Sequence, residues 1–308
     1  MIPPITTAGT RLTVGPEFRL SLFQAEQGGS DGTWQRNRYP FLTSTVTGSV
    51  LNPRYVEKTW FERMKLADRE EPDDLSLARM KRGSKLEPLA RTYFEHMMKV
   101  RVYERGLWVS TERPHTAVSP DGFVLESENK EWNPDNKMDV TSPAEIPTKV
   151  LVEIKCPSST PKEESNGTFI RDTYIVQVMD AMDKLDCTSC YFVILETEQE
   201  MDPIRRLITV PGGPMPYPGK LHVFLVHRSQ FFIDAMRLAV DYFTSCLEHQ
   251  IQPAVDMPFS EKEYANLFTK IRVDTVMQRD IPDSVHRRAL EKIGRGVSEN
   301  SDHMDIDE

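Results

Sequence analysis

The segment 149–155, which reads KVLVEIK, constrains the fold of this chain more than any other. Its apolar side chains form an almost continuous run, which is typical of a buried strand. Glu153 and Lys155 interrupt that run, and both project from one face because side chains alternate along a strand. An edge strand with two solvated charges is the alternative interpretation. Charges in a buried strand need partners or a metal ion, so the segment predicts a polar pocket within a sheet.

A turn with the sequence SPDG, at residues 119–122, precedes this strand. Pro-Asp-Gly is a common turn sequence, so on its own it indicates a turn and nothing more. If Asp121 meets Glu153 and Lys155, however, two carboxylates and one amine share a pocket. The carboxylates then hold a hard divalent cation and the lysine handles a proton or the attacking water, as metal-assisted phosphodiester hydrolysis requires. We expect burial beside a metal ion to lower the pKa of Lys155, which suits a general base.

Two more polar residues lie on helix-like patterns. Glu87 is followed by Pro88, and because proline costs about 3 kcal/mol in a helix interior, the pair predicts a helix start or a kink. The helix dipole favours an acid at a helix start, so Glu87 alone requires no catalytic role. Gln177 lies on an apolar stripe and must find a hydrogen-bond partner, either in the core or in an active site.

The hydrophobic periodicity predicts a helix-rich first part, a group of strands, and then further strands and helices. The predicted helices lie near 18–27, 44–51, 53–69, 73–99, 170–185, 229–250, 260–271 and 283–294. The predicted strands lie near 100–103, 107–110, 122–126, 149–155, 190–196 and 221–226. This order predicts an α/β (α+β) fold with a central mixed β-sheet flanked by helices on both faces.

The length of 308 residues is near the upper limit for one continuous core. We expect an N-terminal arm over 1–33, a main domain over 34–250, a helical extension over 251–295 and an acidic disordered tail over 296–308. The stretch 127–148 is polar and turn-rich, and it is predicted to be a protruding loop inserted in the main domain. A loop of this length is usually functional or disordered.

The net charge of −9 argues against a protein that coats nucleic acid. Residues 34–105 nevertheless carry 15 Lys and Arg against 10 Asp and Glu, a local balance of +5. Such a basic part is suited to orienting DNA, although ordinary variation of surface charge is the alternative. Four cysteines are too few for a disulfide framework, and neither a signal peptide nor a membrane-length apolar stretch is apparent. We therefore expect a soluble intracellular protein, in the cytoplasm or the nucleus of a host.

Several separated motifs together resemble the YqaJ/lambda-exonuclease (alkaline exonuclease) family of the PD-(D/E)XK nuclease superfamily. They follow the family's order over roughly residues 34–196: Gly83…Glu87-Pro88…Tyr93, Ser119-Pro120-Asp121-Gly122, Glu153-Ile154-Lys155-Cys156-Pro157 and Tyr174…Gln177. Upstream, Arg38 and the segment 42–48 (LTSTVTG) resemble the family's arginine followed by a Thr-Ala-Ser sequence and a glycine. The resemblance implies a restriction-endonuclease-like core.

The resemblance also implies a metal site. Asp121, Glu153 and the backbone carbonyl of Ile154 would bind Mg²⁺ or Mn²⁺, with one or two ions per active site. Glu87 would support a second metal ion or its water. Hard carboxylate and carbonyl oxygens suit Mg²⁺, and two ions can stabilise both the attacking and the leaving oxygen.

The remaining implied roles concern the water and the DNA end. Lys155 would activate the attacking water, and Gln177 would orient Lys155 or the nucleophile. Arg38 and Thr45 would bind a 5′ phosphate, although the family has serine where this chain has Thr45. The chain also departs from the family in the long interval between its two acidic motifs, and after about residue 200 it shows no motif of the family.

These features predict a Mg²⁺-dependent deoxyribonuclease, a 5′–3′ exonuclease on linear double-stranded DNA in recombination, repair or viral DNA processing. The expected partners are double-stranded DNA ends, a single-strand-annealing protein and further copies of the chain in a homotrimer. Two alternatives remain: a structure-specific or nonspecific endonuclease on the same fold, and a catalytically decayed DNA-binding or assembly protein. The intact set of Asp121, Glu153 and Lys155 argues against the second.

Two other signals are weak. Cys187 and Cys190 form a lone CxxC without a second pair, so core packing explains them better than zinc. His115 lies six residues before Asp121, and a structural or solvent role is favoured over a metal contact.

Overall fold

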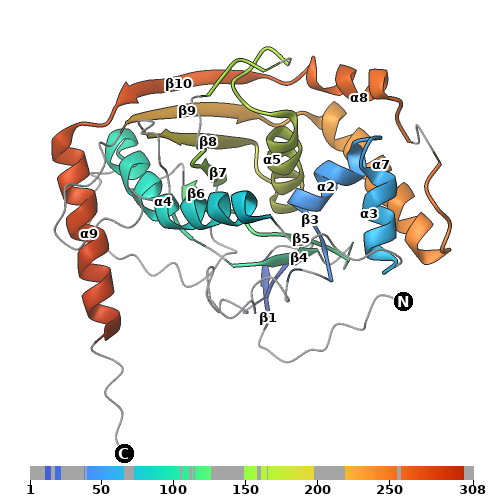
Figure 1. The fold of residues 1–308 in the computed structure, drawn as a ribbon, viewed down its shortest axis with the longest axis horizontal. Helices are drawn as coiled ribbons and strands as arrows, with labels where there is room; N and C mark the ends of the chain where they lie inside the picture. The colour runs from blue at the N-terminus through green and yellow to red at the C-terminus, as the bar shows by residue number, and fades with distance from the viewer. Residues whose placement is uncertain are drawn as a thin grey trace, which may run out of the picture.

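A mixed five-stranded sheet forms the centre of the molecule in a computed structural model (Figure 1). The residues that the structure describes are 11–14, 18–21, 38, 40–65, 73–104, 106–110, 113, 115–125, 149–157, 161–164, 166–197, 219–254 and 258–301. The strand order is β10-β9-β8-β7-β6. The strands are β6 (Gly122–Leu125), β7 (Lys149–Lys155), β8 (Ser189–Glu196), β9 (Lys220–His227) and β10 (Val273–Asp280). Among the described strands of this sheet, β7 and β8 pair in parallel and the other neighbours are antiparallel, which confirms the predicted mixed sheet.

A second five-stranded sheet lies beside the first, below it in Figure 1, in the order β1-β2-β4-β5-β3. Its strands are β1 (Arg11–Val14), β2 (Phe18–Ser21), β3 (Leu42–Thr43), β4 (Trp108–Ser110) and β5 (Thr116–Val118). Strand β5 is separated from β6 only by the turn that contains Asp121. The second sheet therefore delivers this turn to the edge of the central sheet.

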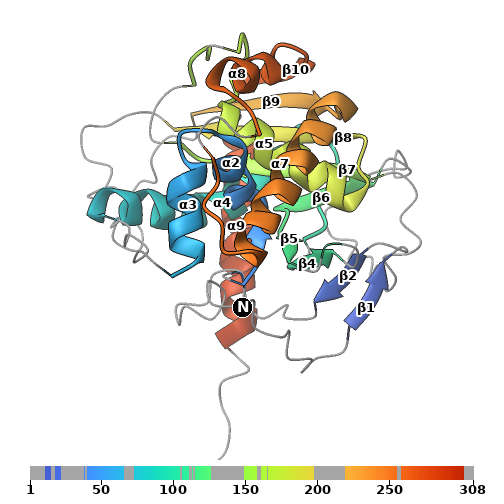
Figure 2. The same cartoon turned by 90° about the vertical axis from the view of Figure 1, so that its right-hand side faces the viewer.

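Helices cover both faces of the central sheet (Figures 1 and 2). They are α2 (Ser44–Leu51), α3 (Val56–Arg63), α4 (Asp74–Met98), α5 (Asp172–Leu185), α7 (Gln230–Glu248), α8 (Glu261–Phe268) and α9 (Asp283–Ser301). Because side chains alternate along β8, Val193 and Leu195 pack in one cluster with α4 and α9. Phe192 and Ile194 pack on the opposite face with α2, α3, α5, α7 and α8. The predicted arrangement of helices on both faces is thus confirmed.

Helix α4 passes through Pro88 without a break, so of the helix start or kink predicted at Glu87-Pro88 the start is not observed. The helix begins after Asp73, whose side chain accepts a hydrogen bond from a first-turn N–H, and it ends at Lys99 in the left-handed conformation. Proline has no N–H, so the carbonyl of Ser84 lacks its helical partner. Both residues are exposed, and water can bond to this carbonyl.

Several elements differ from the sequence prediction. Residues 18–21 form a strand rather than part of a helix, because they pair with β4, and residues 22–27 lie outside the described ranges. The strand predicted at 100–103 is reduced to one bridge between Tyr103 and Phe123. Strands β3 and β5 were not predicted because two or three residues are too short to show a period.

The C-terminal part also differs. Strand β10 is hydrogen-bonded to β9 along its length, so the segment 251–295 supplies a strand of the central sheet as well as helices. Only Met277 of β10 is buried, which explains why no alternating apolar pattern indicated it. Helix α9 runs to Ser301, past the predicted start of the tail at 296. The loop predicted at 127–148 lies outside the described residues.

Within the described ranges, no helix combines the length and the apolar character that a membrane span requires.

Candidate active site

Asp121 is held by the backbone of strand β7. The last described pair between β6 and β7 is Gly122 with Val152, and beyond it β7 continues without a β6 partner. One oxygen of Asp121, Oδ2, accepts a hydrogen bond of 2.7 Å from the N–H of Ile154. The carboxylate thus takes the place of a backbone acceptor, which ties the acidic turn to the residue between Glu153 and Lys155.

Gly122 has a packing role in addition to its role in the turn. A Cβ atom at this position would lie 2.3 Å from Cγ1 of Val102 and 3.3 Å from the carbonyl oxygen of Tyr103. The close approach arises because Tyr103 and Phe123 exchange two backbone hydrogen bonds, of 2.9 and 3.0 Å. A glycine after Asp121 therefore lets the segment before β4 pack against β6.

Glu153 is the centre of the polar contacts. Only 2% of the residue is exposed, and its Oε1 accepts hydrogen bonds from Nζ of Lys155 and from Nε2 of Gln177, the latter at 2.5 Å. Gln177 lies one helical turn after Tyr174 on α5, and Nζ of Lys155 is 5.2 Å from the ring centroid of Tyr174. The structure thus places Gln177 on Glu153 and not directly on Lys155.

Glu87 approaches the same pocket from α4. Burial and the neighbouring charge of Asp121 raise its pKa to about 7, while Arg91 acts in the opposite direction. Nη2 of Arg91 donates a hydrogen bond of 2.7 Å to Oε1 of Glu87, and the same guanidinium also pairs with Glu104. Sequence reasoning missed Arg91, although an acid and a base four residues apart on a helix are a recognisable signal.

The pKa values of Glu153 and Lys155 are both shifted, and each group contributes to the shift of the other. Burial and the carboxylate of Asp121 raise the pKa of Glu153 to about 7, with Lys155 opposing. Burial acts to lower the pKa of Lys155, but the carboxylates of Glu153 and Asp121 outweigh it, so the pKa is raised. Without a metal ion the pKa is raised because two acids face the amine and stabilise its charged form, and the lowered pKa expected beside a metal ion stays a prediction.

The donor set fits a hard divalent cation. The hydrogen bonds to Ile154, Lys155 and Gln177 occupy Oδ2 of Asp121 and Oε1 of Glu153, which leaves one oxygen of each carboxylate for an ion. These oxygens are the ligands that Mg²⁺ prefers. In the described part of the chain, no three His, Cys, Asp or Glu residues are already gathered as a metal-binding group. The fit therefore rests on two carboxylates and a carbonyl rather than on three acids.

Of the two predicted phosphate-binding residues, Thr45 lies in the first turn of α2 and Arg38 precedes that helix in the sequence. Thr45 is exposed in the first turn, Arg38 is half-buried, and the N-cap residue Thr43 makes no side-chain cap. The hydroxyl of Ser44 is buried and has no hydrogen-bond partner. Uncapped N–H groups at a helix start attract anions, so the local geometry is compatible with the predicted role, which stays a prediction.

A buried ion pair lies between this segment and α5. Nζ of Lys184 donates to Oδ2 of Asp180 at 2.6 Å, to the carbonyl of Ala117 at 3.3 Å and to that of Leu42 at 3.5 Å. Both residues of the pair lie on α5, and Lys184 thus joins this helix to the backbones of β3 and β5. Neither residue was singled out from the sequence.

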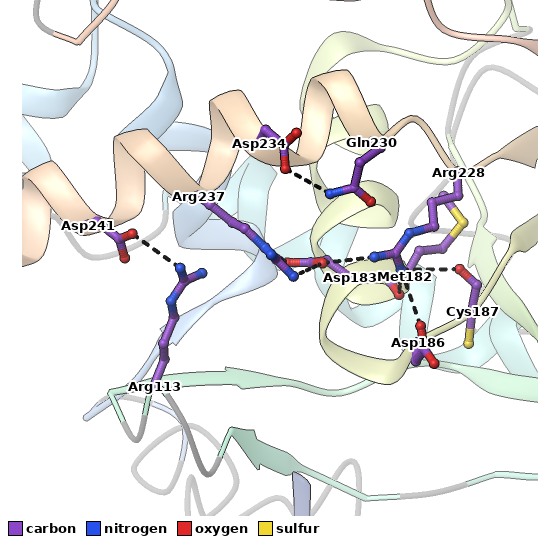
Figure 3. A network of polar contacts seen from close by, with 10 residues as sticks. All are labelled: Arg113, Met182, Asp183, Asp186, Cys187, Arg228, Gln230, Asp234, Arg237 and Asp241. Atoms are coloured by element: carbon purple, nitrogen blue, oxygen red, sulfur yellow. Dashed lines mark hydrogen bonds and ion pairs between the residues drawn. The ribbon is translucent and has the colours of Figure 1, made fainter. Parts of the chain in front are cut away.

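A second set of ion pairs fixes the C-terminal end of α5 (Figure 3). Asp183 pairs with Arg228 at 3.1 Å and with Arg237 of α7 at 2.7 Å. Nη1 of Arg228 also donates to the carbonyl of Met182 at 2.7 Å. These contacts hold α5 against α7 and the end of β9, and so support the position of Gln177.

The CxxC pair and His115, the two weak sequence signals, lie among buried residues of the protein. Cys187 and Cys190 are free, buried and part of the hydrophobic core. The carbonyl of His115 accepts the N–H of Leu42 at 2.8 Å, and Nε2 of His115 is buried without a partner.

The fold and the pocket define the class of this protein. A mixed sheet that carries an acidic turn, a Glu-x-Lys strand and a neighbouring acid from a helix is the arrangement of the PD-(D/E)XK nuclease superfamily, as the sequence resemblance implies. Comparison with known families then gives the family. The description "YqaJ-like viral recombinase domain" matches residues 33–187, half of the chain, and this range contains every candidate site residue. The chain belongs to this family.

Exonucleases are among the solved structures to which the chain shows similarity. The alkaline exonuclease (LHK-Exo) from Laribacter hongkongensis is 21% identical, with a TM-score of 0.46, over 71% of this chain and 93% of that chain. The structure of LHK-Exo in complex with dAMP is 20% identical, with a TM-score of 0.47, over 71% of this chain and 93% of that chain. A phage-related exonuclease from Haemophilus somnus 129PT is 10% identical, with a TM-score of 0.42, over 68% and 96%. A comparison with curated proteins gives no match.

Proposed function

We propose that this chain is a deoxyribonuclease that hydrolyses DNA phosphodiester bonds with Mg²⁺ or Mn²⁺. Its proposed activity is that of a 5′–3′ exonuclease on linear double-stranded DNA, in recombination, repair or viral DNA processing. The observation that carries the proposal is the buried carboxylate of Glu153, which Lys155 and Gln177 hold beside Asp121. Membership of the YqaJ-like viral recombinase family supports DNA as the substrate.

The proposed metal ligands are Asp121, Glu153 and the carbonyl of Ile154, with Glu87 near a second ion or its water. A bound cation would polarise the phosphate and neutralise the carboxylates that raise the pKa of Lys155. Lys155 can then accept the proton of the attacking water, since it lies on the same strand face as Glu153. Gln177 keeps the Glu153 carboxylate in one orientation.

Arg38 and Thr45 are the proposed contacts to the 5′ phosphate of the strand that is degraded. The guanidinium suits bidentate pairing with a phosphate, and the exposed hydroxyl and the uncapped N–H groups of α2 add donors. Specific binding of this phosphate would make the enzyme begin at a DNA end.

The test is digestion of an end-labelled linear duplex with Mg²⁺, in parallel with covalently closed plasmid. We expect stepwise loss of the linear duplex and no cutting of the closed form. Glu153→Gln and Lys155→Met should each reduce the rate by at least about 10²-fold. Lys262→Met and Glu291→Gln are matched charge controls at exposed positions and should leave the rate unchanged.

Other outcomes separate the alternatives. Cutting of the closed plasmid would establish an endonuclease, and an inactive protein that still binds duplex would establish a decayed nuclease fold. Equal rates on 5′-phosphate and 5′-hydroxyl ends would contradict the proposed role of Arg38 and Thr45.

The proposed partners are a single-strand-annealing protein and two further copies of the chain in a trimer. Light scattering of the purified chain, alone and with linear duplex, tests the trimer. A monomer under both conditions would contradict it.

A further inference from the structure

Arg82 joins the ends of the two parallel strands beside the catalytic pocket. It lies on α4, five residues before Glu87. Its Nη2 donates to the carbonyl of Pro157 at 3.3 Å and to the hydroxyl of Thr197 at 2.5 Å. Pro157 follows β7 and Thr197 follows β8, so the guanidinium lies at the carboxyl ends of both strands.

The charge of Arg82 is not compensated by any carboxylate of the described residues. The residue is half-buried, and its Nε is buried with no hydrogen-bond partner. Burial lowers its pKa, which means that the surroundings disfavour the charge. Arg91 and Arg228, by contrast, each pair with an acid. A desolvated cation without an anion is costly, so Arg82 has unused capacity for an anionic ligand.

The position of Arg82 indicates which anion this is. Ligands of open α/β sheets bind outside the carboxyl ends of parallel strands. Pro157 lies two residues after Lys155, so an anion on Arg82 would lie beside the proposed site of hydrolysis. A polyanionic strand that reaches Lys155 and Glu153 has further phosphates within its own length to present there.

We propose that Arg82 binds a backbone phosphate of the DNA strand that is cut, next to the phosphate at the catalytic pocket. This inference rests on the proposed function. Nη1 of the guanidinium makes no hydrogen bond among the described residues and, unlike Nε, it is not buried, so Nη1 is the donor that forms the site. The tether to Pro157 and Thr197 fixes the guanidinium, so little side-chain freedom is lost when the phosphate binds.

A purely structural tether between the ends of β7 and β8 is the competing explanation. The matched control is Thr197→Val, which removes the hydroxyl acceptor and retains the charge of Arg82. Arg82→Gln removes the charge and retains a hydrogen-bond donor, and Arg82→Lys retains the charge and loses the planar fork.

The experiment measures binding of a fluorescent linear duplex by anisotropy, in EDTA to prevent cutting, at several NaCl concentrations. We expect Arg82→Gln to weaken binding about tenfold. The slope of log K against log salt should fall by about 0.7 to 0.9, as for one lost phosphate contact. Arg82→Lys should keep the wild-type slope with weaker binding. Thr197→Val should also keep the slope and should lose clearly less affinity than Arg82→Gln, because the charge of Arg82 and its contact with Pro157 remain.

Two results would overturn the inference. One is an unchanged salt slope in Arg82→Gln, and the other is an equal loss of affinity in Thr197→Val. If Arg82→Gln does not fold, the comparison of Arg82→Lys with Thr197→Val still decides, because a tether predicts that both weaken binding equally. A wild-type chain that neither binds nor cuts DNA would contradict the proposed function itself. If the wild type cuts DNA but Arg82→Gln has the same salt slope as the wild type, only the role of Arg82 is contradicted.

Discussion

The buried ion pair of Asp180 and Lys184 leads to a prediction about protein stability. Removing one of the two charges should destabilise the protein more than removing both. Only 2% of Asp180 and 8% of Lys184 are exposed, so both charges are desolvated. If Asp180 is replaced by alanine, Lys184 keeps only the two carbonyl contacts, at 3.3 and 3.5 Å. An unpaired buried charge of this kind costs about 3–5 kcal/mol of stability.

Lys184→Met should be similarly harmful, because it leaves the Asp180 carboxylate buried without its cation. The double variant Asp180→Ala/Lys184→Met removes both charges and leaves mainly apolar surroundings. Replacing a buried pair by apolar residues is often neutral, so the double variant should be more stable than either single variant. A loss of 3–5 kcal/mol is a large part of a typical stability of about 5–15 kcal/mol.

The measurement is urea unfolding of the four proteins, followed by circular dichroism, with both the midpoint and the slope compared. The reasoning is refuted if the double variant loses the sum of the two single losses, since the charges would then not be coupled. It is also refuted if Asp180→Ala costs less than about 1 kcal/mol, as an exposed pair would.

Three further predictions concern the pocket. Gly122→Ala should cost about 1–3 kcal/mol in urea unfolding, because its Cβ would meet Val102 at 2.3 Å; an unchanged midpoint would contradict this packing. In EDTA, wild type should lose stability relative to Glu153→Gln as the pH rises from about 4.5 to about 7, because the folded state holds the Glu153 proton to a higher pH; parallel stability curves would contradict this. Gln177→Leu should reduce the rate of hydrolysis with little effect on the Kd for duplex in EDTA, whereas equal loss of both would indicate a structural role.

Strand β7 was predictable because its signal is local. A period of two places Glu153 and Lys155 on one face wherever the strand lies, and the structure joins them as expected. The direction of the pKa shift of Lys155 was not predictable in this way. It depends on Asp121, which approaches through the pairing of β6 with β7, whose paired residues are 24 to 30 positions apart in the sequence.

Elements that depend on distant pairing were the ones that the sequence missed. Strand β2 exists because it pairs with β4, and its short sequence fits a helix equally well. Arg82 makes its contacts with residues 75 and 115 positions away, so nothing near it in the sequence indicates them. Local periodicity therefore predicted the central sheet and most helices. Contacts between residues far apart in the sequence could be identified only from the three-dimensional structure.

Strand β10 has a consequence for how copies of this chain can associate. It is the outermost described strand on one side of the central sheet, and its register shifts between Thr275 and Met277. Asp274, Arg279 and Asp280 add charges along it. Irregular register and charge on an outer strand discourage the addition of another chain's strand, which would lead to open-ended aggregates. These features disfavour an assembly that extends this edge of the sheet and favour one that forms through side-chain surfaces.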